Sequence, residues 1–104
     1  MRELILTLDI GTSSARALVW DSEGRELEEF RTQIPYAMDT TPDGGVEIEA
    51  ERLLQIVAES LDGVLANLGS RAQELRGVGV STFWHSVLGI DAEGTPLTPI
   101  NVWA

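Results

Sequence analysis

The sequence contains no cysteine, no lysine and a single histidine. The lack of cysteine excludes disulfides, thiolate nucleophiles and thiolate metal sites. The lack of lysine excludes the phosphate-binding loop G-x-x-x-x-G-K-S/T, which depends on that side chain. Seven arginines are outnumbered by seventeen acids, which gives a formal net charge of −10. Because each contact with a nucleic-acid phosphate needs a local cation, this balance argues against nucleic acid as a partner.

Long apolar runs are also missing. No run approaches the roughly 18 residues that a membrane-spanning helix needs, so we expect no membrane partner. The apolar stretch near the N-terminus soon meets an acid, Asp9, which argues against a signal peptide. A hydrophobic content of 43% is typical of globular proteins, and 104 residues suit one small domain. We therefore expect a cytoplasmic protein.

Three strands are expected in the first third of the chain. Residues 4–9 are largely apolar and predict a buried strand, and residues 11–14 predict a tight turn. A second strand is expected over 15–21. A third is expected over 26–33, where the polar sequence is typical of a sheet edge. Gly24 fits a hairpin turn between them that needs a positive φ.

A helix is the clearest element of the remaining sequence. Between residues 53 and 68, apolar side chains recur at helical spacing, and Gly69 fits the end of the helix. Short strands are expected over 78–81 and 87–91, with an extended segment over 96–103. The predicted stripe consists of Leu53, Leu54, Val57, Leu61, Val64, Leu65 and Leu68.

Three antiparallel strands, a crossover helix and a parallel returning strand make an α/β fold. This order is similar to the opening of a ribonuclease H-like, or actin-like ATPase, half-domain. The crossover should be right-handed, and it should place the fourth strand parallel to the first, because a helical crossover returns the chain in the same direction.

The turn after the first strand carries the most chemical information. Its acid, Asp9, could hold a hydrated Mg²⁺, which needs few carboxylates. Arg16 could offset negative charge on phosphates. Backbone N–H groups and hydroxyls of a tight turn can converge on phosphate oxygens, which is what phosphoryl transfer requires. The candidate phosphate-binding residues are Gly11, Thr12, Ser13, Ser14 and Arg16.

Two other interpretations of this turn stay open from spacing alone. A turn of glycine and hydroxyl residues also occurs without any ligand. Asp-x-Gly-Thr also resembles the motif of aspartic proteases, in which two carboxylates share a proton. That family has a hydroxyl residue where this chain has Ile10, and the helical stripe at 53–68 has no place in it. The protease interpretation is therefore disfavoured.

The turn and its flanking strands resemble the first phosphate motif of the actin-like ATPases, which include sugar kinases, chaperone ATPases and actin. Residues 44–51 resemble the segment before the first long helix of the FGGY carbohydrate kinases. That family usually has an aromatic residue in place of Gly45 and Asp-Pro in place of Glu49-Ala50. Residues 78–87 resemble its substrate loop, and 96–103 its following segment.

Within that family, the gluconate kinase branch is the most similar. It shares the run Trp84-His85-Ser86-Val87 in part, and the Pro-Leu-Thr-Pro run at 96–99. Xylulokinases also have a histidine in place of His85. The resemblance implies ATP and Mg²⁺ as cofactors and a sugar or sugar acid as substrate, with gluconate the first choice. It implies that the substrate is bound by Trp84, His85 and Trp103.

The resemblance also implies that residues 1–104 form part of the N-terminal domain of a larger kinase. Its general base, an aspartate, is expected downstream of Ala104, so no catalytic residue is assigned within the chain. We expect residues 1–104 alone to be inactive, since the rest of this domain and a C-terminal domain are needed. The resemblance leaves room for a homodimer of the intact enzyme.

Two alternatives come from other functional classes. The chain could be a stand-alone module that binds a nucleotide or a partner without turnover. It could also be half of a chaperone-type ATPase. The loop at 84–86 stands against the chaperone, because a chaperone would have no sugar-site residues there.

Overall fold

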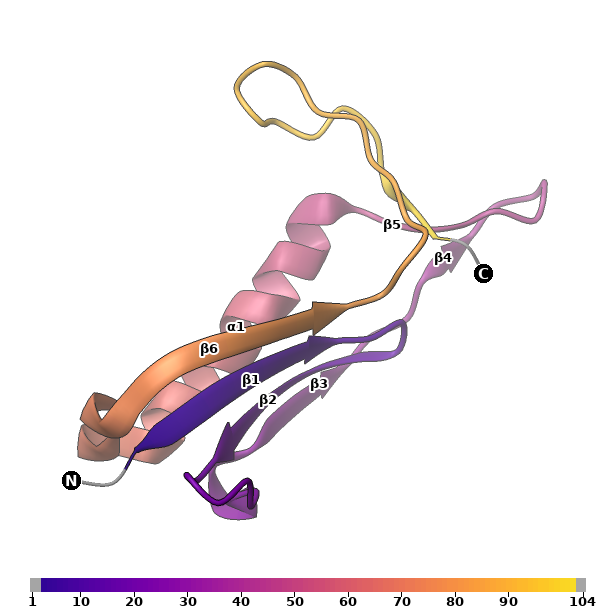
Figure 1. Ribbon diagram of the computed structural model, residues 1–104. Coiled ribbons are helices and arrows are strands. Elements are labelled where there is room, and N and C mark those ends of the chain that lie inside the picture. Colours follow the sequence, from indigo (N-terminus) through magenta and orange to yellow (C-terminus); the bar gives the residue numbers. More distant parts are fainter. Residues whose placement is uncertain (1–2, 103–104) are drawn as a thin grey trace.

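The computed structural model describes residues 3–102, in which one long helix covers one face of a four-stranded sheet (Figure 1). A small three-stranded sheet lies at one end of this body. The elements are β1 (Leu4–Ile10), β2 (Ser14–Trp20), the 3-10 helix η1 (Glu28–Phe30), β3 (Thr32–Pro35), β4 (Asp39–Thr40), β5 (Val46–Ile48), α1 (Ala50–Leu68), the 3-10 helix η2 (Gly69–Glu74), β6 (Leu75–Thr82) and β7 (Ile100–Asn101).

The main sheet has the order β3-β2-β1-β6. β1 and β2 pair antiparallel, as do β2 and β3, whereas β6 returns parallel to β1 after α1. This confirms the predicted α/β layout, with the fourth strand parallel to the first, and the structure adds that the two are direct neighbours. β6 begins three residues earlier than the predicted strand at 78–81, since its first residues also pair with β1.

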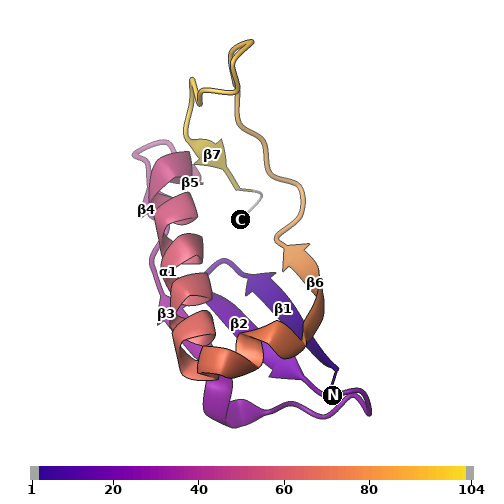
Figure 2. The same cartoon turned by 90° about the vertical axis from the view of Figure 1, so that its left-hand side faces the viewer.

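The core lies between the sheet and α1 (Figure 2). Side chains of β1 alternate between its two faces, so three leucines point to the helix and are buried. They pack with Ala17 and Val19 of β2 and with Val64 and Leu68 of α1. The buried side chains of β1 are Leu4, Leu6 and Leu8.

The helical stripe is confirmed in part. Leu53, Val64 and Leu68 are buried, whereas Leu54 and Leu65 are exposed, so these two members of the stripe do not join the core. They lie on a flank of α1 that no other element covers among residues 3–102. Gly69 ends the helix with a φ of 57°, as expected. No helix formed by residues 3–102 is long and apolar enough to cross a membrane.

The predicted strand over 26–33 is wrong except at its last two residues, which begin β3. Leu27 and Phe30 are three residues apart, and both pack against the core. A spacing of three cannot point two side chains the same way in a strand, but it does so in a 3-10 turn. The backbone N–H of Phe30 donates to the carbonyl of Leu27 at 3.2 Å, and the strand begins only at Thr32.

The predicted strand over 87–91 is also wrong. This segment makes only isolated bridges, Val87 with Asn101 and Ile90 with Pro96. Prolines at 96 and 99 have no N–H to donate, so a continuous ladder cannot form. A side chain replaces one missing contact, because the N–H of Gly89 donates to the hydroxyl of Thr98 at 2.8 Å.

α1 approaches β3 closely at one glycine. The hydroxyl of Thr32 donates to the carbonyl of Ser60 at 2.7 Å, which ties the strand to the helix. A Cβ built on Gly63 would lie 2.8 Å from the methyl carbon of Thr32. The helix can therefore sit at this distance only because residue 63 has no side chain.

Substitution Gly63→Ala should lower the free energy of unfolding by about 1 kcal/mol, because overpacking outweighs the gain in helix propensity. Urea unfolding measures the effect. In a Thr32→Ser background, which keeps the hydroxyl and removes the methyl group, the same substitution should become neutral or stabilising. Equal losses in both backgrounds would show that this contact does not limit the packing distance.

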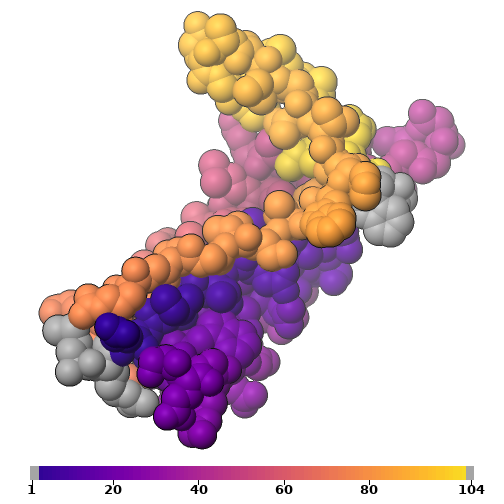
Figure 3. Space-filling model, viewed as in Figure 1, coloured from indigo at the N-terminus to yellow at the C-terminus, as the bar shows by residue number. Residues whose placement is uncertain are grey.

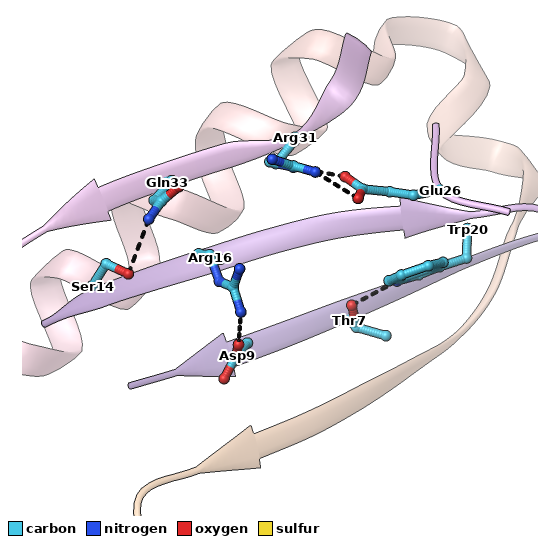
Figure 4. A network of polar contacts seen from close by, with 8 residues as sticks. All are labelled: Thr7, Asp9, Ser14, Arg16, Trp20, Glu26, Arg31 and Gln33. Carbon is cyan, nitrogen blue, oxygen red and sulfur yellow. Dashed lines mark hydrogen bonds and ion pairs between the residues drawn. The ribbon is translucent and has the colours of Figure 1, made fainter. Parts of the chain in front are cut away.

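A forked ion pair brackets η1 (Figure 4). The guanidinium of Arg31 donates from Nε and Nη2 to the two carboxylate oxygens of Glu26, at 2.7 and 2.6 Å. The side chain of Glu26 is only 14% exposed. The hydrogen bonds from Arg31 lower the pKa of Glu26, and the charges of Arg31 and Arg16 act in the same direction.

Glu26→Gln should therefore lower the urea midpoint in a pH-dependent manner. Because the folded pKa lies below the ordinary value of 4.5, the stabilisation is complete above that value and is lost as the pH falls through the folded pKa. The difference between wild type and variant should be constant near neutral pH and vanish in acid. Glu23→Gln is the control, since its pair with Arg25 is largely exposed. A difference that persists unchanged in acid would contradict the assignment.

Candidate functional site

The tight turn predicted at residues 11–14 is present between β1 and β2. The N–H of Gly11 donates to the carbonyl of Ser14 at 2.9 Å. Thr12 and Ser13 at its tip are exposed, whereas Gly11 and Ser14 are half-buried. The turn therefore places four of the candidate phosphate-binding residues in one short exposed loop.

Most carbonyls of this turn already have partners. The carbonyl of Ser14 accepts from Gly11, that of Ser13 accepts from the N–H of Tyr36 at 2.9 Å, and that of Gly11 accepts from the hydroxyl of Tyr36. Within residues 3–102, the N–H groups of Thr12 and Ser13 donate no hydrogen bond. The turn thus offers donors and few acceptors, which suits an anion.

Among the hydroxyls of the turn, one has a hydrogen-bond partner and two do not. The hydroxyl of Ser14 accepts from Nε2 of Gln33 at 3.2 Å, which ties the end of the turn to β3 (Figure 4). Those of Thr12 and Ser13 have no hydrogen-bond partner among residues 3–102. Two hydroxyls at the tip are therefore available to a ligand.

Asp9 and Arg16, which the sequence suggested for a metal ion and for phosphate, contact each other. They stand directly opposite in the register of β1 and β2, and the guanidinium of Arg16 donates to Oδ2 of Asp9 (Figure 4). Their side chains are 39% and 41% exposed, on the sheet face opposite α1. Ser81 of β6 is the other register partner of Asp9. Both charged groups are therefore accessible next to the turn.

The same face of the sheet carries a hollow of about 610 Å³. Two of its lining residues are joined, because the indole N–H of Trp20 donates to the hydroxyl of Thr7 at 2.8 Å. Each charged group in the lining is already ion-paired, Asp9 with Arg16 and Glu26 with Arg31. The lining residues are Thr7, Leu8, Asp9, Arg16, Leu18, Trp20, Glu26, Gly79, Val80 and Ser81.

Trp84 and His85, the two predicted substrate residues that the structure describes, follow β6 on an exposed loop. Trp84 is 73% exposed, and the two ring centroids lie 6.3 Å apart in an edge arrangement. His85 has a φ of 55°, a left-handed conformation that is uncommon outside glycine. Trp103 lies outside the described residues. The loop therefore presents both rings to solvent, on a backbone held in an unusual conformation.

The turn at 11–14, the candidate phosphate-binding turn, and this loop leave the sheet at the same edge. β1 and β6 run parallel, with Asp9 opposite Ser81 and Ile10 opposite Thr82. The carboxyl ends of parallel strands meet at one edge, which is where open α/β sheets bind ligands. The parallel pairing of β1 and β6 thus places the candidate phosphate-binding turn and the loop of His85 at the ends of neighbouring strands.

The chain beyond β6 projects from the body as an arm and returns through β7 (Figure 3). β7 pairs with β5, and the N–H of Val102 donates to the carbonyl of Val46 at 2.9 Å. This pairing joins two family-like segments that are far apart in the sequence. The two segments flank an open hollow of about 340 Å³, lined by Glu49, Ala50, Glu51, Pro96, Leu97, Thr98 and Pro99.

The structure explains the departure from the family pattern at Gly45. A Cβ at this position would lie 2.6 Å from the hydroxyl oxygen of Thr41, which accepts a hydrogen bond from the N–H of Gly45. A larger residue would have to displace that hydroxyl. The turn between β4 and β5 therefore fits glycine at residue 45 in this chain.

Sequence reasoning missed Tyr36, which holds two carbonyls of the phosphate turn. The residue lies in the short connection between β3 and β4. The one signal was an aromatic residue directly after Pro35. Nothing local to Tyr36 indicates that it reaches back by 25 positions to Gly11.

Comparison with known proteins places these features in a family. Residues 4–104 match the N-terminal domain of the FGGY family of carbohydrate kinases. A ribulokinase from Geobacillus thermodenitrificans is 29% identical, over 92% of this chain and 19% of its own length. The chain thus spans about a fifth of the length of such relatives.

Solved structures show the same fold. A "xyloylose kinase" from Brucella ovis superposes with a TM-score of 0.88 at 22% identity, over 97% of this chain and 21% of its own. A gluconate kinase from Lactobacillus acidophilus gives a TM-score of 0.75 at 20% identity, over 99% and 20%. The actin-like half-domain expected from the strand order is confirmed. Because the family match covers nearly the whole sequence, the chain belongs to the FGGY family of carbohydrate kinases.

Proposed function

We propose that the chain acts as part of an ATP-dependent kinase that transfers the γ-phosphate to a hydroxyl of a sugar or sugar acid. The observation that carries this proposal is the turn at 11–14. Its carbonyls are largely satisfied, two of its N–H groups are free to donate, and Asp9 and Arg16 lie directly beside it. Phosphoryl transfer depends on such positioning and electrostatics more than on covalent chemistry.

In this proposal the turn binds the phosphates of ATP. The N–H groups and hydroxyls of Thr12 and Ser13 donate to phosphate oxygens, and Gly11 and Ser14 shape the loop. Arg16, which is partly exposed, offsets negative charge on the phosphates. An anion can attract Arg16 away from Asp9 because the pair is accessible to solvent and worth little on its own.

Mg²⁺ fits this site through Asp9. The arginine contacts Oδ2 of the carboxylate, and Oδ1 has no partner among residues 3–102. No group of three or more His, Cys, Asp or Glu side chains gathers within residues 3–102 to hold a metal. The ion would therefore take most of its ligands from water and phosphate, as Mg²⁺ commonly does. Bound there, it would neutralise charge on the phosphates.

For the substrate, we propose gluconate first and xylulose as the alternative. The proposal rests on the run at 84–87 and the Pro-Leu-Thr-Pro segment at 96–99. His85 would exchange a hydrogen bond with a substrate hydroxyl, and the rings of Trp84 and Trp103 would contact its C–H faces. The edge shared by β1 and β6 supports this, because it puts the loop of His85 beside the phosphate turn.

No general base is assigned within residues 1–104, so the proposed activity belongs to the full-length gene product that contains this chain. We place the base, the second domain and any homodimer contact outside these residues. The reaction consumes ATP, so we keep the cytoplasm as its compartment. We propose no nucleic-acid partner, because the charge balance argues against one.

The full-length gene product should phosphorylate a polyol or sugar acid in the presence of ATP and Mg²⁺. A panel that includes gluconate, xylulose, ribulose and glycerol, scored by ADP release, measures the preference. Thr12→Ala and Ser13→Ala together should raise the KM for ATP by about tenfold, because two hydrogen bonds to phosphate are lost. Tight ATP binding with no transfer to any member of the panel would favour the binding module instead.

His85→Ala should raise the KM for the preferred substrate roughly fivefold, the effect of one lost hydrogen bond, without changing the KM for ATP. His85→Gly distinguishes the effect of losing the ring from that of backbone strain, since glycine adopts the positive φ of residue 85 without strain. Both variants should behave alike if the imidazole matters. An unchanged substrate KM in both would remove His85 from the site.

A further inference from the structure

Tyr36 lies between β3 and β4 and contacts the phosphate turn at two points. Its hydroxyl donates to the carbonyl of Gly11, and its backbone N–H donates to the carbonyl of Ser13 at 2.9 Å. The approach follows from the register of β2 and β3, in which Pro35 stands opposite Ser14. Tyr36 is therefore the next residue along, and it lies beside the turn.

These two hydrogen bonds fix peptide planes as well as carbonyls. In a trans peptide the carbonyl of one residue and the N–H of the next are held in one plane and point in opposite directions. Holding the carbonyl of Gly11 therefore fixes the N–H of Thr12, aimed away from the phenol of Tyr36. Holding the carbonyl of Ser13 fixes the following peptide, at the start of β2, in the same way.

The phenol is suited to hold this carbonyl. It is half-buried, and burial raises its pKa above the ordinary value of 10, so the hydroxyl stays protonated and able to donate at neutral pH. Tyr36 is the single tyrosine of the chain. Phenylalanine at this position would keep the ring and remove only the donor.

We propose that Tyr36 is a positioning residue for the phosphate-binding turn, which it holds with the N–H of Thr12 directed at the nucleotide. The inference rests on the proposed function of the turn and deepens it. Tyr36 acts through the backbone of Gly11 and Ser13 and does not itself contact the phosphates. Its contribution is preorganisation, because the turn does not have to be ordered when ATP binds.

The test compares Tyr36→Phe with wild type in the full-length gene product. Calorimetry with ATP and Mg²⁺ gives the Kd for the nucleotide, and a second titration gives the Kd for the preferred sugar. Tyr36→Phe should weaken nucleotide binding roughly fivefold, the effect of one net hydrogen bond, and leave sugar binding unchanged. If Tyr36 had a purely structural role, Tyr36→Phe would lower the stability of the protein without weakening nucleotide binding selectively.

Thr32→Val is the matched control. It removes a hydrogen bond of the same kind, from the hydroxyl of Thr32 to the carbonyl of Ser60, which joins β3 to α1 away from the turn. Its melting temperature should fall about as much as that of Tyr36→Phe, with unchanged ATP affinity. Equal loss of ATP affinity in both variants would overturn the inference, since general destabilisation would then explain it.

Ser13→Ala separates this inference from the proposed function. Weaker ATP binding in Ser13→Ala with unchanged binding in Tyr36→Phe would overturn the role of Tyr36 and leave the phosphate turn standing. Unchanged ATP binding in both variants, or no ATP binding by the wild type, would overturn both the inference and the assignment of the turn.

Discussion

The two faces of β1 are the constraint on which the rest of the structure depends. Leu4, Leu6 and Leu8 must be buried against α1, and the alternation of a strand then forces Thr7 and Asp9 onto the opposite face. Because β1 pairs with β2 and β6, the face of β1 that is buried decides which face of the whole sheet packs against α1. Arg16 of β2 stands opposite Asp9 in the register, so the two side chains lie on the same face and contact each other. The position of Asp9 and Arg16 in the candidate site thus follows from hydrophobic burial on the other face of the sheet.

The proposed anion site is compatible with a net charge of −10 because its features are local. Backbone N–H groups carry partial positive charge in any sequence, and the turn leaves two of them free by satisfying its carbonyls elsewhere. The nearby acids are ion-paired, Asp9 with Arg16 and Glu26 with Arg31, so their charge is partly neutralised. A protein with few cations can therefore present a surface suited to phosphate at one edge of a sheet.

The fold was predictable where local pattern and packing agree. The apolar run of β1, the helical stripe of α1, the positive φ of Gly24 and the stop at Gly69 all appear in the structure. The strand expected over 26–33 failed because Leu27 and Phe30 reach the core through a turn, which period-two counting misses. The contact of Asp9 with Arg16 depends on the pairing register of β1 and β2. The hydrogen bonds from Tyr36 to the turn depend on the order of three strands. Neither can be derived from neighbours in the sequence.

The parallel pairing of β1 with β6 has a consequence for how the chain folds. β1, β2 and β3 follow one another in the sequence, so they can pair through local contacts. β6, in contrast, pairs with β1 across roughly 70 intervening positions. During synthesis, the outer edge of β1 stays unpaired until β6 has emerged and α1 has formed. An open edge beside exposed leucines is a template for pairing with other chains. The interval before β6 arrives is therefore the stage at which this chain is most prone to aggregate.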